Sequence, residues 1–437
     1  MKKDFLVPLM LCASLTCQAN DYFFNPVFKT KEAYYSNIRL LQTPPQDNWV
    51  TTLSPGVNFG LRHENGELKS NFTWNQLFYT NQTELNISEQ LFSMGYQHKG
   101  ERLQWGTSGY YYHQSYLNTE STGTVLGAVN FTQIMAKQLS LAPTVTYAID
   151  ERSSLSLDYS YNKTAYDKNP NVLYYSDYDY HQVSGTFSHL YTENDKLNVT
   201  LSGSRYKTVL RDYPTYNEVA QLGWQHSFSQ QLVAYVSAGI NYSQTKIPNL
   251  QDPLLSQAFY LGVFPVLYDP AVGCRQSLIP GNNPCYIDPD TNGLTPIQRY
   301  GVEDSNKFGQ VFQGSIQKSF ERGSVSLVGS RNQTPTSQGL QTSTSLSINN
   351  AYTINERWTS GLTATYSNNV ITGQQRNLYD RTNITISPNI NWKWTPEINV
   401  GLSYTFRHQE YKNQSNALGN IVQLQFSYQP QTNYQVK

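Results

Sequence analysis

The stretch that decides the fold is "SLSLDYSYNKTAYDKNPNVLYYSDYDYHQVSGTFSHL", residues 154–190. From Leu155 to Tyr161, a leucine or tyrosine at every second position alternates with serine, aspartate or asparagine. A tyrosine-rich stretch interrupts this pattern, and a second alternating run follows it. Because successive side chains of a strand point to opposite faces, this period predicts strands with one apolar and one polar face.

The same alternation recurs along the whole chain. It is seen in the runs Leu197–Leu201, Ile384–Trp392 and Val400–Phe406. Short turns separate such runs, namely "HENGE" at 63, "HKGE" at 98, "AIDERS" at 148, "YTENDK" at 191, "FSQQ" at 228, "FERG" at 320, "INER" at 354 and "KWTPE" at 393. These eight turns join sixteen strands, and one further strand at each end (about 32–41 and about 419–429) predicts about eighteen.

Antiparallel strands with polar and apolar faces suit a chain that meets lipid on one side and water on the other. In lipid every backbone amide must be hydrogen-bonded internally, so a sheet has to close on itself. We therefore predict an all-β fold, a transmembrane antiparallel β-barrel with short periplasmic turns and long extracellular loops. A soluble β-sandwich also alternates, but aromatic residues near the turns fit the interfacial girdles of a barrel better. These residues are Phe187, Trp224, Phe228, Trp358, Trp392 and Trp394.

The composition limits the class of protein. Charged residues make up 14% of the chain and the hydrophobic set 38%, with 34 tyrosines against 4 methionines. A soluble domain usually carries about 25% charged residues, whereas a disordered chain would be poor in aromatic residues. The formal net charge is zero, which argues against a nucleic-acid partner because phosphate binding needs a basic face.

The first residues predict export from the cytoplasm. "MKKDFLVPLMLCASLTCQAND" has a basic start, an apolar core and small residues before a cleavage point after Ala19, so residues 1–19 are expected to be a secretory signal. We expect 20–31 to be a periplasmic segment, 32–429 the barrel in the outer membrane of a Gram-negative cell, and 430–437 a periplasmic tail. The mature chain keeps Cys274 and Cys285, which we expect to form a disulfide.

The connection 244–306 holds both of these cysteines and several prolines. Loops of this length are usually functional or disordered. It is expected either to fold into the lumen as a constriction or to face outward. Within it, "DPDTNG" places Asp288, Asp290 and Asn292 at the spacing of a calcium loop, but Arg299 stands where the bidentate glutamate should be. A plain turn is the favoured interpretation.

Tyrosines near the predicted extracellular rim are the candidates for a saccharide path. Aromatic rings can stack on sugars while nearby amides and hydroxyls bind sugar hydroxyls. The candidates are Tyr110, Tyr112, Tyr178 and Tyr180, together with Tyr174 and Tyr175. Leu103 and Trp105 are expected on the lipid face of their strand. Tyr110 and Tyr112 lie an odd number of residues from them, so the alternation places both inside the barrel. The alternative is that tyrosine is simply abundant at membrane interfaces.

His113 and Ser115 share one face of a predicted strand and resemble the active strand of outer-membrane phospholipase A. The asparagine-glycine that follows the serine in that family is absent, with Tyr116 and Leu117 in its place, and no third catalytic group is identifiable. We expect no enzymatic activity. Phosphate-loop, zinc and haem-attachment motifs are also absent from the sequence, so no cofactor is predicted.

The last strand, "LGNIVQLQFSYQP", resembles the closing strand that the barrel assembly machinery reads. Val422, Leu424, Phe426 and Tyr428 alternate after Gly419. Barrels of this type usually end on the aromatic residue, whereas nine residues follow Tyr428 here. The machinery is an expected partner, as are outer-membrane lipid and lipopolysaccharide.

Three segments resemble bacterial outer-membrane β-barrel proteins found in exopolysaccharide and exosortase-associated gene clusters. They are "WVTTLSPGV" (49–57), "KQLSLAPTVTYAIDERSSLSLDYSYNK" (137–163) and "YDYHQVSGTFSHLYTENDKLNVTLSGSRY" (178–206). The resemblance implies a channel component for polysaccharide export, with a polysaccharide and periplasmic export components as partners. A general diffusion porin and a non-conducting structural or adhesive barrel are the alternatives. No arginine-rich segment of the porin kind is identifiable in the sequence.

Overall fold

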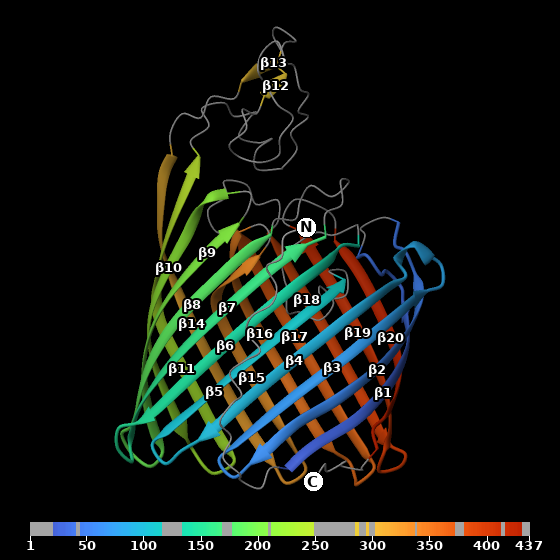
Figure 1. Ribbon diagram of the computed structural model, residues 1–437, viewed down its shortest axis with the longest axis horizontal. Coiled ribbons are helices and arrows are strands. Elements are labelled where there is room, and N and C mark those ends of the chain that lie inside the picture. Colours follow the sequence, from blue (N-terminus) through green and yellow to red (C-terminus); the bar gives the residue numbers. More distant parts are fainter. Residues whose placement is uncertain are drawn as a thin grey trace.

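The protein forms one large closed β-barrel in its computed structural model (Figure 1). The structure describes residues 21–40, 44–115, 133–167, 177–208, 211–248, 285–287, 294–296, 302–336, 339–371, 380–411 and 416–430. The barrel strands are β1 (Asp21–Tyr35), β2 (Asn48–His63), β3 (Gly66–Tyr79), β4 (Ile87–Lys99), β5 (Leu103–Ser115), β6 (Met135–Ala148), β7 (Ser153–Tyr166), β8 (Tyr178–Leu190), β9 (Asp195–Thr208), β10 (Arg211–Ser227), β11 (Leu232–Pro248), β14 (Val302–Phe320), β15 (Gly323–Thr336), β16 (Gly339–Thr353), β17 (Trp358–Ile371), β18 (Arg381–Lys393), β19 (Ile398–Tyr411) and β20 (Ala417–Tyr428).

Each barrel strand pairs antiparallel with its neighbours, and the pairing of β1 with β20 closes the ring of 18 strands. The predicted fold class and strand number are therefore confirmed. All eight predicted short turns lie at one end of the barrel, which we call the short-turn end. The other end, called the long-connection end, carries the remaining connections. Two of these are only two residues long, 209–210 and 337–338.

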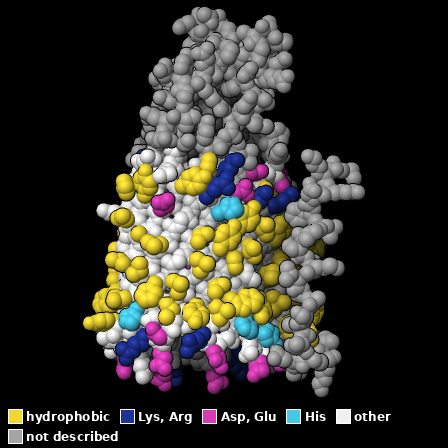
Figure 2. All heavy atoms as spheres, turned by 60° about the vertical axis from the view of Figure 1, so that its left-hand side comes forward, with side chains coloured by type: hydrophobic (Ala, Val, Ile, Leu, Met, Phe, Trp, Pro, Cys, Tyr) yellow, Lys and Arg dark blue, Asp and Glu magenta, His cyan; other side chains and the backbone are white. Residues whose placement is uncertain are grey.

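The outer face of the barrel is apolar. Large side chains exposed on it alternate with inward-facing small and polar ones, as with Leu155 and Leu157 on β7 and Leu197, Val199 and Leu201 on β9. Figure 2 shows hydrophobic side chains over a broad belt, with charged groups gathered along the short-turn edge and near the opposite edge. This two-faced wall is what a strand needs between lipid and water.

The predicted aromatic girdle at the short-turn end is present. Phe187, Trp224, Phe228 and Trp394 are exposed there. Trp358 on β17 stacks on Trp392 of β18, with ring centroids 5.7 Å apart and planes at 12°. No helix in the described part of the chain is long and apolar enough to cross a membrane.

The first strand differs from the prediction. β1 occupies Asp21–Tyr35, not 32–41, so most of 20–31 is barrel wall and not a separate periplasmic segment. Lys29 and Lys31 obscured the apolar alternation, but in the structure they share the inner face, where charge is tolerated. Ile38 lies beyond the strand and packs in a buried cluster with Val50, Leu77, Tyr79 and Leu85, next to the short helix η1 (Thr83–Leu85).

The insertion 244–306 is described only in part. Its first residues complete β11, and its last ones begin β14. Between them the structure describes a small two-stranded sheet, β12 (Cys285–Ile287) and β13 (Leu294–Pro296). Figure 1 draws this sheet beyond the long-connection end of the barrel.

Candidate functional site

The lumen wall is the candidate functional site because it carries the polar face of every barrel strand. On β7, for example, Ser156, Asp158 and Ser160 point inward and pair with Thr186, Ser184 and Gln182 of β8. Hydroxyl and amide groups bond across neighbouring strands on this face, as between Thr186 and Thr200 at 3.0 Å and between Asn71 and Asn58 at 2.7 Å. These neutral groups can form hydrogen bonds with water and with other molecules that carry hydroxyl groups.

The tyrosines predicted inside the barrel are on its inner face. Tyr110 and Tyr112 pair with Ser140 and Gln138 of β6 and stack on each other, with centroids 4.4 Å apart and planes at 21°. Tyr178 and Tyr180 also face inward, as strand residues of β8 and not as loop residues.

A fifth tyrosine completes this group and was missed by sequence reasoning. Tyr206 on β9 lies opposite Tyr180, and its ring centroid is 5.7 Å from that of Tyr178. Tyr178, Tyr180 and Tyr206 form a buried cluster. The alternation of Tyr206 with Ser204 and Ser202 would have predicted its inward direction. We call Tyr110, Tyr112, Tyr178, Tyr180 and Tyr206 the tyrosine group.

Charges on the inner face are unevenly distributed. By strand register, the inward cations of the described strands are Lys29, Lys31, Arg62, Lys69, Lys99, Lys196, Lys307, Arg381, Lys393 and Arg407. Among the side chains that the structure describes, the inward carboxylates are Asp21, Glu67, Glu89 and Asp158. Cations therefore outnumber carboxylates on the lumen wall, although the chain as a whole has no net charge.

Barrel closure brings several of these cations onto one wall. Lys29 and Lys31 on β1 pair with Ser427 and Gln425 of β20, which in turn pairs with β19, the strand of Arg407. Arg407 is buried and donates from Nη2 to the backbone oxygen of Asn37 at 3.3 Å. Barrel closure thus places Lys29 and Lys31 on the inner face at the seam between β1 and β20, which we call the basic wall.

The barrel wall separates at the long-connection end between β14 and β15. β14 pairs with β15 only up to Phe312 and Arg331, while the rest of β14 continues alongside β11. The free end of β15 pairs with β16 alone. On its other side β16 stays paired with β17 as far as Gln341, opposite Ile371. We call residues 332–336 and 339–343 the β15–β16 hairpin tip.

Contacts place the β15–β16 hairpin tip across the lumen. Gln333 shares a face with the outward residues of β15, yet its Oε1 lies 3.1 Å from the Oγ of Ser243, an inward residue of β11. Residues of β16 also come within 8 Å (Cα–Cα) of β9, five strands away around the sheet. The outer face of β15 can contact the inner face of β11 only if the hairpin tip bends into the lumen.

The contact surface is polar and buried. Ser243 Oγ lies 2.8 Å from Asn217 Oδ1, to which Asn241 also donates at 3.2 Å. On the tip, Gln341 and Ser343 are buried, Gln341 to 2% exposure. The side chains of Asn217, Asn241 and Ser243 satisfy one another's hydrogen bonds, whereas Nε2 of Gln341 has no hydrogen-bond partner in the described part of the chain. The structure therefore narrows the lumen with a hairpin that sequence analysis treated as two ordinary strands.

His113 and Ser115 share one face of β5, as predicted, and this is the outer face. A carboxylate not found from the sequence stands beside His113: the Nε2 atom is 3.2 Å from Oδ2 of Asp167. However, Ser115 is 0% exposed, and its Oγ has no hydrogen-bond partner in the described part of the chain. A nucleophile needs access to substrate and a base within reach, so the arrangement does not favour hydrolysis.

Several predicted features fall outside the described residues. These are Cys274, the calcium-loop residues Asp288, Asp290 and Asn292, the loop tyrosines Tyr174 and Tyr175, the signal 1–19 and the tail beyond residue 430. They stay predictions. On the closing strand, Val422, Leu424, Phe426 and Tyr428 share the outer face as predicted, while Gly419 faces inward opposite Arg407.

Neither a protein-family model nor a curated protein sequence matches the chain. Solved structures resemble it along nearly its full length. The Pseudomonas aeruginosa protein OccK9 (OpdG) aligns with a TM-score of 0.44 and 10% identity, covering 93% of this chain and 98% of that one. Acinetobacter baumannii OccAB4 aligns with 0.45 and 7%, covering 95% and 99%. A BenF-like porin from Pseudomonas fluorescens Pf-5 aligns with 0.46 and 7%, covering 94% and 98%. At these identities the similarity concerns barrel architecture only.

Proposed function

We propose that this protein is an outer-membrane channel that conducts hydrophilic solutes, with neutral or anionic saccharides as the solute class. The observation that carries the proposal is the inner wall. It is lined by hydroxyls and amides, its cations outnumber its carboxylates, and it presents the stacked and partly exposed rings of Tyr110 and Tyr112. In this placement the short-turn end faces the periplasm and the long-connection end faces the cell exterior.

The finer form of the proposal is export of a surface polysaccharide, which the family resemblance implies. An exported polymer must pass the lumen while small solutes are retained, so a narrowed long-connection end supports this form over an open diffusion porin. A non-conducting barrel is the second candidate, favoured by the buried polar contact between the β15–β16 hairpin tip and β11.

The test is single-channel conductance of purified protein in planar bilayers, with neutral and anionic oligosaccharides added to the long-connection side. A channel of this kind should conduct, and oligosaccharides should block it reversibly. The double variant Tyr110→Ala and Tyr112→Ala should weaken the block about tenfold. The reason is that contact between a sugar and an aromatic ring is expected to contribute about 1 kcal/mol per ring. Absence of conductance in wild type and in a variant with a shortened hairpin tip would favour the structural barrel.

A further inference from the structure

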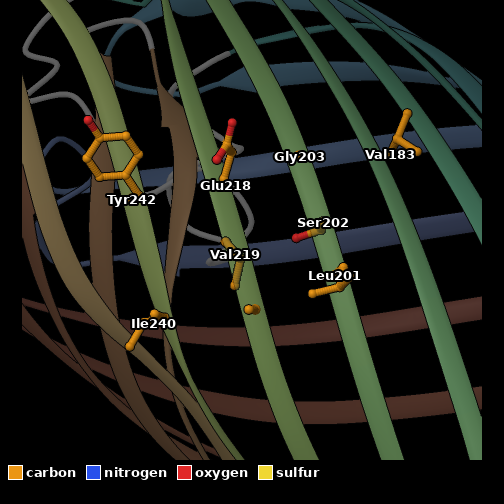
Figure 3. Close-up of a pocket in the computed structure, with 9 residues that line it drawn as sticks. Val183, Leu201, Ser202, Gly203, Glu218, Val219, Ile240 and Tyr242 are labelled. Carbon is orange, nitrogen blue, oxygen red and sulfur yellow. The ribbon is translucent and has the colours of Figure 1, made fainter.

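The outer wall carries a surface that the proposed channel activity does not use. On the outside of β8–β11, side chains leave a groove of about 590 Å³ (Figure 3). Its outward lining residues are Val183, Leu201, Gly203, Glu218, Ala220, Ile240 and Tyr242. Gly203 and Ala220 lie at its floor because they have no bulky side chain, while Leu201 and Ile240 stand at its sides, 61% and 60% exposed.

The groove lies near the middle of the membrane, with Glu218 at its end nearer the long connections and Ala220 and Ile240 nearer the short turns. Glu218 is six residues along β10 from the girdle residue Trp224. This is about 20 Å of strand and about 15 Å of membrane depth at the usual strand tilt. The terminal part of an acyl chain of the outer leaflet reaches this depth and can lie against the groove.

Three cations stand on the same outer face, directly above the groove. Arg205 and Lys207 follow Gly203 on β9 at every second position, and Lys163 on β7 lies across Asp179 of β8 from Lys207. Lys163 and Lys207 are therefore about 10 Å apart, two strand spacings. All three are exposed, and no carboxylate of the described residues lies within 4 Å of their side-chain nitrogens.

The two carboxylates of this surface are in different settings. Asp179 accepts a hydrogen bond from the Tyr161 hydroxyl at 3.3 Å. His181, between these cations, contacts the Tyr159 hydroxyl at 2.9 Å. Glu218 stands at the head of the groove opposite Gly203 and Tyr242, where it can accept from an N–H or O–H group. The surface therefore offers cations for phosphate, an acceptor for an amide or hydroxyl, and an apolar groove for a chain.

We infer that this surface binds the phosphorylated, acylated amino-sugar lipid of the outer leaflet, that is, the lipid A part of lipopolysaccharide. Its phosphates match Lys163, Arg205 and Lys207, its amide and hydroxyl groups match Glu218, and one acyl chain fills the groove. The inference rests on the proposed outer-membrane placement but not on conduction. Lipid binding and conductance are measured separately, so failure of one leaves the other standing.

The test is binding of diphosphoryl lipid A to the full-length protein in detergent. Wild type should bind lipid A, and Lys163→Ala, Arg205→Ala and Lys207→Ala together should weaken binding about a hundredfold, at about fivefold for each cation near an anionic headgroup. The control is Lys318→Ala, which removes an outward cation from the short-turn end of β14, where it lies over Phe320. It should leave binding unchanged.

A second variant tests the groove without touching charge. A Cβ at Gly203 would meet nothing within 4 Å, so Gly203→Leu fills the groove without a backbone clash and should weaken lipid A binding about tenfold. Gly329→Leu is the matched control: this outward glycine of β15 has only ordinary contacts, the nearest to Leu346 Cδ1 at 3.7 Å. Heat-modified migration on electrophoresis checks that each variant is folded.

Three further probes decide between lipid sources. Phosphatidylglycerol and dephosphorylated lipid A should each bind at least tenfold more weakly than lipid A, and inorganic phosphate should not compete. Equal binding of phosphatidylglycerol would overturn the inference in favour of a non-specific anionic lipid shell. Competition by inorganic phosphate would overturn the inference in favour of a free-anion site. Equal lipid A binding by wild type and the triple variant would show that these three cations do not bind lipid A.

Discussion

Asp167 joins three strands at the long-connection end of the outer wall. Its carboxylate contacts His113 of β5 at 3.2 Å and Lys137 of β6 at 3.2 Å, and its N–H donates to the backbone oxygen of Met135. Burial alone would raise the pKa of this carboxyl, but the hydrogen bonds from His113 and Lys137 outweigh it, and the pKa lies below its usual value.

The lowered pKa of Asp167 predicts a pH-dependent contribution to stability. A carboxyl with a depressed pKa stabilises the folded state above its unfolded pKa of about 4, and this contribution is lost as pH falls through the folded pKa. Asp167→Asn should reduce the free energy of unfolding at pH 7 by less than about 1 kcal/mol, because the side chain is partly exposed. The change is measured as a small decrease in the melting temperature in detergent. The gap between wild type and variant should close below about pH 4; a gap unchanged at pH 3 would contradict this account.

At the scale of elements, the β15–β16 hairpin tip is the feature that narrows the lumen. Replacing residues 332–343 by Asn-Gly would remove Gln333 and join Arg331 to Thr344, which are already paired, through a turn suited to a two-residue hairpin. We expect a larger single-channel conductance, roughly twofold or more, because the tip no longer reaches β11. Removing 250–284 from the long insertion should leave conductance nearly unchanged. The reverse result would make the insertion the constriction.

The closing strand β20 makes a second prediction at this scale. Phe426 and Tyr428 face outward and pair with Thr30 and Phe28 of β1, at the seam that closes the barrel. Replacing both by alanine should reduce the folded, heat-modifiable fraction in outer membranes several-fold, because the closing strand is what we expect the assembly machinery to read. A chain ending at Gln429 should assemble like wild type, since the N–H of that residue already extends the β19–β20 pairing by a hydrogen bond to the backbone oxygen of Glu397.

The whole molecule should select anions. Its formal net charge is zero, but closure distributes cations in excess over the lumen wall. In a gradient of potassium chloride, the reversal potential should have the sign of chloride preference, as charged rings in a pore favour counter-ions. Lys29→Gln with Lys31→Gln should shift it toward zero. Lys163→Gln, an outward substitution, is the control and should leave it unchanged; cation selectivity in wild type would refute the charge argument.

The period of two in the sequence determined the barrel, its strand number and the inward direction of Tyr110 and Tyr112. Alternation and turn chemistry are local, so they can be read from neighbouring residues. The start of β1 was not predicted because inward lysines such as Lys29 interrupt the apolar alternation. Charged side chains are tolerated in the lumen but not on the lipid face. Only tertiary structure decided the basic wall, the contact of Gln333 with Ser243 and the groove around Gly203. Each of these depends on strands that meet through closure or folding over, and no local pattern records which distant strands will touch.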